Sequence, residues 1–74
     1  MIEEYFVIVI TVRDYEFSGK TRIIQNESFH KYCNYPDRNM IKKEMERWDI
    51  VIDGKRAVLP LHAKVEKRYS YKGD

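Results

Sequence analysis

The sequence has a single cysteine, and only three glycines and two prolines, among its 74 residues. Because Cys33 cannot form an internal disulfide, a small secreted scaffold held by bridges is excluded and a reducing compartment is favoured. Three glycines leave no glycine-rich phosphate loop. The apolar run from Tyr5 to Val12 is too short for a signal peptide or a membrane-crossing helix. We therefore expect a cytoplasmic protein with no membrane partner.

The sequence also carries little net charge. Fourteen basic and twelve acidic side chains give +2, which is small for a protein whose affinity rests on phosphate neutralisation alone. The charge is uneven, since residues 1–37 hold four basic and six acidic side chains and residues 38–74 hold ten and six. The halves thus carry −2 and +4, and an anionic partner should meet the second half.

The length suits one small domain, residues 1–74, and no more. Hydrophobic residues make up 43% and charged residues 35% of the chain, which is ordinary for a folded soluble domain. Isoleucine, lysine and tyrosine, whose codons are AT-rich, are frequent. This usage is typical of a low-GC bacterium or its phage.

Two strands are predicted in the first third of the chain. Residues from Tyr5 to about Asp14 are rich in β-branched and aromatic side chains on both faces, which is typical of a central strand covered on both sides. Ser18 and Gly19 predict a tight turn, and residues 20–25 predict the second strand of a β-hairpin.

A helix and a third strand follow. Pro36 and Asp37 predict a helix that runs to about Trp48, since proline fits the first helical turn and an early carboxylate complements the helix dipole. Its apolar stripe, which consists of Ile41, Met45 and Trp48, should cover the sheet. Residues 49–53 predict a third strand, and the dipeptide Asp53–Gly54 is typical of a hairpin turn into a fourth.

The last third allows two interpretations. From Ala57 to Tyr71 apolar or aromatic residues occupy nearly every odd position, which predicts a strand. Leu61, Val65 and Tyr69 also recur every four residues, which would suit a helix beginning at Pro60. We favour the strand because the alternation extends beyond this recurrence in both directions. Pro60 then belongs at an edge or a bend.

The predicted fold is an α+β domain of order ββαββ, with an antiparallel sheet and one helix packed on one face. One helix leaves the second face of the first strand open, so either the C-terminal strand bends across it or a second copy covers it. We therefore expect a homodimer through the sheet as one solution. The predicted core consists of Phe6, Ile8, Ile10, Val12, Ile24, Ile41, Met45, Trp48, Val51, Leu61 and Val65.

An aromatic segment between the second strand and the helix is the first candidate site. Tyrosine and phenylalanine are favoured at interface hot spots, so this segment could contact a protein partner. It could equally plug the end of the core. The candidate partner-binding residues are Phe29, His30, Tyr32 and Tyr35.

The polar face of the last strand is the second candidate site. Lys64 and Arg68 stand roughly 13 Å apart along a strand, about two phosphate steps of a nucleic-acid strand. Glu66 between them favours a merely solvated face. The candidate nucleic-acid-binding residues are Arg56, Lys64, Arg68 and Lys72.

No catalytic, metal or cofactor site is expected. A zinc site at His30 and Cys33 would need carboxylates to complete four ligands. A cysteine hydrolase needs a base, an orienting group and an oxyanion site, which a single sheet layer scarcely provides. Neighbouring acids, such as Glu44 with Glu46, diverge on a helix.

The function that these features favour is a small non-enzymatic interaction protein. It would regulate or inhibit a protein partner through a sheet face or edge and the aromatic segment. The alternative is a nucleic-acid-binding protein that uses the basic strand face, and a third option is a subunit that serves assembly only. The fold order alone assigns no activity.

Overall fold

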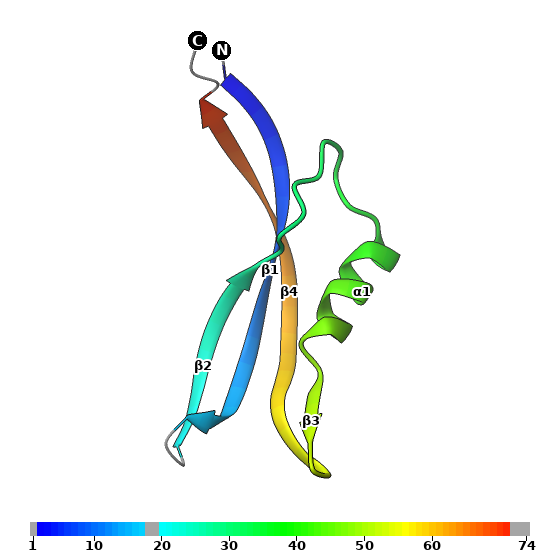
Figure 1. The fold of residues 1–74 in the computed structure, drawn as a ribbon. Helices are drawn as coiled ribbons and strands as arrows, with labels where there is room; N and C mark the ends of the chain where they lie inside the picture. Colours follow the sequence, from blue (N-terminus) through cyan, green and yellow to red (C-terminus); the bar gives the residue numbers. More distant parts are fainter. Residues whose placement is uncertain (1, 18–19, 72–74) are drawn as a thin grey trace.

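The computed structural model describes residues 2–17 and 20–71, without the side chains of Glu16 and Phe17. Four antiparallel strands form one open sheet in the order β2-β1-β4-β3, and a single helix packs on it (Figure 1). This confirms the predicted α+β fold of order ββαββ. The elements are β1 (Ile2–Phe17), β2 (Lys20–Glu27), α1 (Arg38–Arg47), β3 (Ile50–Ile52) and β4 (Lys55–Tyr71).

The two long strands β1 and β4 form a ribbon at the centre of the sheet. The two strands pair from Ile2 with Tyr71 down to Asp14 with Val58. The last third is therefore a strand, as favoured from the alternation, and the helical alternative is wrong. The ribbon runs past the other elements at the end that holds both termini (Figure 1). Its tyrosines there, Tyr69 and Tyr71, are 62% and 82% exposed, because α1 does not reach them.

Two turns were predicted from dipeptides. Asp53 and Gly54 have φ angles of 52° and 76°, and two successive positive φ angles are those of a type I′ hairpin turn. This turn joins β3 to β4 as predicted. The other predicted turn, Ser18 and Gly19, lies outside the described residues.

Helix α1 begins with a side-chain cap. Asp37 has extended backbone angles, and its Oδ1 accepts a hydrogen bond of 2.9 Å from the Met40 N–H. This contact satisfies one of the N–H groups that have no partner inside a helix. The helix ends one residue before Trp48, whose N–H donates to the Met45 carbonyl at 3.0 Å. No helix of the described residues is both long and apolar enough to cross a membrane.

The core lies between α1 and the sheet. Ile8, Ile10 and Val12 are fully buried, and they share one face of β1 because alternate residues of a strand point the same way. The predicted helical stripe is confirmed, since its residues pack against this cluster. The partly buried residues around it are Ile24, Tyr32, Ile41, Met45, Trp48, Val58, Ala63 and Val65.

The core prediction is wrong for two residues, because Val51 is 54% exposed and Leu61 is 40% exposed. The alternation in the sequence predicts a single phase through β4, but the pairing of β4 with β1 shifts register between Thr11 and Val12. Thr11 pairs with His62 and Val12 pairs with Pro60, which leaves Leu61 as an extra residue. Such a bulge shifts the alternation by one, and proline fits there because it donates no ladder hydrogen bond. Val51 belongs to a strand of three residues at the sheet edge.

The second face of β1 is also buried. Val7 and Val9 are 3% and 4% exposed, although α1 lies on the other face. They pair with Glu66 and Lys64 of β4. Neither a strand bent across this face nor a second copy is needed to bury them, because long polar side chains of the neighbouring strands flank them. A homodimer through the sheet stays a prediction.

The side chains on this face form a charged cluster, which we define as Glu27, Lys64, Glu66 and Arg68. Arg68 Nη2 lies 2.6 Å from Glu27 Oε1, and Arg68 Nη1 lies 2.5 Å from Glu66 Oε1. Lys64 Nζ lies 2.8 Å from Glu66 Oε2. Since Arg68 belongs to β4 and Glu27 to β2, the cluster extends across β1. The aliphatic stems of such side chains cover apolar surface while the charged ends stay in water.

Candidate functional site

The aromatic segment divides into exposed and packed residues. Phe29 is 91% and Tyr35 is 67% exposed, and His30 is exposed as well. Tyr32 is instead partly buried against the core cluster. The two interpretations of this segment therefore apply to different residues. Tyr32 plugs the core, whereas Phe29, His30 and Tyr35 are available for contact.

Hydrogen bonds to β1 anchor the chain at Ser28 and at Tyr32, on either side of Phe29 and His30. The buried Ser28 accepts from the Ile8 N–H at 3.0 Å through its Oγ, which also donates to the His30 carbonyl at 3.0 Å. Tyr32 pairs with Phe6 through backbone hydrogen bonds of 2.8 and 2.9 Å. Phe29 is therefore presented from a backbone that is anchored on both sides. Sequence reasoning missed Ser28, because a lone serine in an irregular segment gives no signal.

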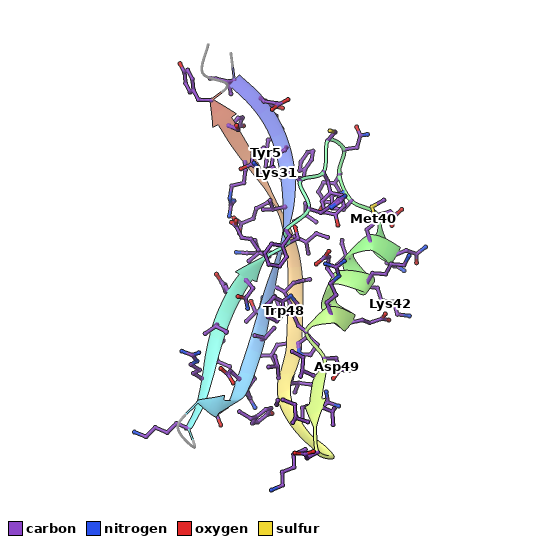
Figure 2. All side chains as sticks on the ribbon, in the orientation of Figure 1. Tyr5, Lys31, Met40, Lys42, Trp48 and Asp49 are labelled. Carbon is purple, nitrogen blue, oxygen red and sulfur yellow. The ribbon has the colours of Figure 1, made fainter. Side chains whose placement is uncertain are left out.

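A side-chain contact with Tyr5 adds to this anchoring. Tyr5 lies on the face of β1 that carries Val7 and Val9, opposite α1. Lys31 Nζ lies 4.9 Å from the centre of the Tyr5 ring, and both residues are labelled in the upper part of the sheet in Figure 2, toward the end that carries the termini. A cation above an aromatic face at this distance is attracted by the ring. Phe6 and Tyr35 also meet, edge to face, with centroids 5.6 Å apart.

A cavity of about 220 Å³ lies between this segment and the C-terminal half of α1. Trp48, which Figure 2 places beside the sheet where the helix ends, contributes to its wall. The most exposed aromatic ring of the described residues therefore borders an apolar hollow. Its lining residues are Glu27, Ser28, Phe29, Glu44, Arg47, Trp48 and Ile50.

A second cavity of about 270 Å³ lies further toward the N-terminal end of α1. Its lining residues are His30, Tyr32, Met40, Lys43, Glu44 and Arg47. Because Glu44 and Arg47 border both cavities, we treat the two cavities together as one helix–loop groove. It has an apolar end at Trp48 and a more polar end at Tyr32.

Glu44 lies at the middle of the helix–loop groove and is only 7% exposed. Arg47 Nη1 is 3.8 Å from Glu44 Oε1, and the Arg47 side chain is 67% exposed. The sequence predicts no catalytic role for Glu44, because Glu44 and Glu46 diverge on a helix. A signal was nevertheless present, because Glu44 lies three residues after Ile41 and one before Met45, on the flank of the apolar stripe.

The groove raises the pKa of the Tyr32 phenol. The main cause is burial, and the nearby Glu44 carboxylate adds to it while Arg47 opposes it. The phenol, whose ordinary pKa of 10.0 already keeps it protonated at neutral pH, has a hydrogen to donate. The His30 ring lies beside it, with centroids 5.3 Å apart.

The four basic candidates do not gather at one place. Lys64 and Arg68 belong to the charged cluster, where they pair with carboxylates. Hydrogen bonds from Lys64 and then Arg68 lower the pKa of Glu66, and hydrogen bonds to Glu66 and then Glu27 raise the pKa of Arg68. Arg56 pairs with Asp49, roughly 40 Å along β4 from Arg68 at about 3.3 Å per residue. Lys72 lies outside the described residues.

Cys33 is exposed. Over residues 2–17 and 20–71, no three or more histidine, cysteine or acidic side chains gather closely enough to hold a metal ion.

Comparison with protein families, with curated proteins and with solved structures finds no match for this chain.

Proposed function

We propose that this chain is a small non-enzymatic interaction protein that regulates or inhibits a protein partner. It binds that partner through the helix–loop groove and the exposed side chains of Phe29, His30 and Tyr35. The observation that carries the proposal is the 91% exposure of Phe29 beside the apolar cavity at Trp48.

Protein interfaces supply the physical reason. Aromatic side chains near the centre of an interface contribute most of the binding energy, where pockets exclude water around them. Phe29 extends from a backbone that Ser28 and Tyr32 tie to β1, so little conformational entropy is lost when it docks. The apolar cavity beside it can accept a partner side chain.

The outer edge of β4 adds a second contact. Beyond Val58, the described residues of β4 pair with β1 only, since β3 reaches no further than Val58. An unpaired strand edge can accept an extended segment of a partner through backbone hydrogen bonds. The groove and this edge together would bind a partner more tightly than either alone.

The proposal is tested by comparing variants in affinity capture from the native host, with mass spectrometry. We expect Phe29→Ala to lose a partner that the unaltered chain and Tyr71→Ala both retain. Tyr71 is a matched control because its ring is also largely exposed, at 82%, but it lies at the far end of the ribbon. Thermal melting checks that each variant folds. Retention of every captured protein by Phe29→Ala would overturn the proposal.

The same experiment separates the nucleic-acid alternative. Binding by the basic face would disappear after nuclease treatment and would fall steeply with salt. Lys64→Glu with Arg68→Glu would then abolish a gel shift. The ion pairs of Lys64 and Arg68 within the charged cluster favour the protein partner instead.

A further inference from the structure

We propose that the helix–loop groove receives an arginine side chain of the partner. Its guanidinium would bind the Glu44 carboxylate, and an adjacent apolar side chain would occupy the cavity at Trp48 and Phe29. This inference rests on the proposed function and specifies the chemistry that the same surface recognises.

The burial of Glu44 and its lack of a close hydrogen-bond donor are the first reason. Its side chain is 91% buried, since 9% remains exposed, and its nearest charged partner atom is 3.8 Å away. Among the described residues, Glu44 accepts no side-chain hydrogen bond within ordinary distance. Over the described residues, the buried side-chain polar atom that lacks a hydrogen-bond partner is Asn26 Nδ2, so the Glu44 oxygens remain open to the groove, where they can accept hydrogen bonds. A ligand that donates hydrogen bonds would fill these acceptor sites.

The position of Glu44 is the second reason. It borders both the apolar cavity and the polar cavity, so a ligand in either one can reach its carboxylate. Arg47 limits this access little, because its guanidinium is largely in solvent and its contact with Glu44 is long. The Tyr32 phenol, which stays protonated, borders the same polar cavity.

Arginine fits this site better than other polar side chains. Its planar guanidinium donates two parallel hydrogen bonds to a carboxylate, and it also stacks on aromatic rings such as Trp48 and Phe29. Lysine offers a compact, strongly hydrated charge without this planar match. An acidic segment would be attracted by Lys43 and Arg47 but would bring a second carboxylate against Glu44. Because these two cations border the groove, we expect an isolated arginine probe to bind weakly.

The probe is a blocked tripeptide with a central arginine between two leucines. Trp48 is the only tryptophan of the chain and borders the cavity, so its fluorescence reports occupancy. Two matched peptides replace the arginine by citrulline, its uncharged isostere, or by glutamate. The protein is used unaltered and as Glu44→Gln, with Glu46→Gln as control, since Glu46 is an exposed residue of the same helix.

We expect a saturable change in Trp48 emission with the arginine peptide, for the unaltered chain and for Glu46→Gln. The citrulline peptide, and the arginine peptide on Glu44→Gln, should bind at least about tenfold more weakly, because the buried charge pair is lost. The citrulline comparison needs no variant, so it holds even where Glu44→Gln fails to fold.

Three results would overturn the inference: equal binding of the arginine and citrulline peptides, preference for the glutamate peptide, or no saturable change at millimolar peptide. Failure here is distinct from failure of the proposed function. Suppose that Phe29→Ala loses the captured partner while Glu44→Gln keeps it. The proposed docking surface is then supported, and the inference that it binds an arginine is wrong. If the arginine peptide binds but Phe29→Ala keeps every partner, the groove recognises arginine and the proposed docking is wrong.

Discussion

The two faces of β1 are buried to nearly the same extent, but by different kinds of side chain. On one face Ile8, Ile10 and Val12 are fully buried beneath the apolar stripe of α1. On the other, Val7 and Val9 are 3% and 4% exposed beside the charged cluster. A packed helix face has fixed side chains, whereas the stems of lysine, arginine and glutamate are flexible.

This difference teaches that burial alone does not measure how rigidly a site is packed. A closely packed core relaxes only partly around a deleted group, so a cavity remains and adds to the cost. Flexible charged side chains can instead move into the space. It also explains how a strand that is apolar on both faces exists in a small protein with one helix.

The largest effect should come from Ile10→Ala on the helix face. Ile10 is fully buried in the cluster that α1 covers, so its loss removes apolar burial and leaves a cavity. We expect a loss of about 2 to 5 kcal/mol in the free energy of unfolding, measured by urea denaturation. A cost below about 1 kcal/mol would show that the helix face is as adaptable as the charged one.

A matched pair of valines sharpens the comparison. Val12→Ala on the helix face should cost about 2 kcal/mol, and Val7→Ala on the charged face about half as much, because the charged cluster can close over the gap. Both variants make the same chemical change in the same strand. Equal costs in urea denaturation would mean that the charged side chains are held as firmly as the helix.

Much of the fold could be predicted from the sequence because its signals are local. The Asp53–Gly54 turn, the Asp37 helix start and the alternation of β4 each depend on a few neighbouring residues. The phase of the alternation could not be predicted across Leu61, since a bulge depends on how β4 meets β1. Leu61 was therefore placed in the core, although it is 40% exposed.

The candidate site could be predicted only in part. Aromatic content pointed to residues 29–35, but the exposure of Phe29 and the packing of Tyr32 depend on the anchoring of both ends to β1. Glu44 was missed because its burial requires the aromatic segment to lie beside α1. Contacts between segments that are distant in sequence are not visible in local patterns.

The smallest expected effect is the pH dependence of stability that the charged cluster produces. Hydrogen bonds from Lys64 and then Arg68 lower the pKa of Glu66 below its ordinary value of 4.5. A carboxyl group with a lowered pKa in the folded state stabilises the fold above its ordinary pKa, and this contribution disappears as the pH falls through the folded value. Glu66→Gln should therefore melt slightly below the unaltered chain at neutral pH, and the gap should shrink as the pH falls below 4.5 and through the lower pKa of the folded state.

Salt distinguishes the charge of Glu66 from its stem. Because 31% of the Glu66 side chain is exposed, salt partly screens its ion pairs, so the melting gap should shrink at high ionic strength. Glutamine keeps the same aliphatic length, so Val7 and Val9 stay covered in Glu66→Gln. A difference in melting temperature that persists at low pH and in high salt would mean that the shape of the Glu66 side chain, and not its ion pairs, keeps this face of β1 covered. The two faces of β1 would then differ less than their chemistry suggests.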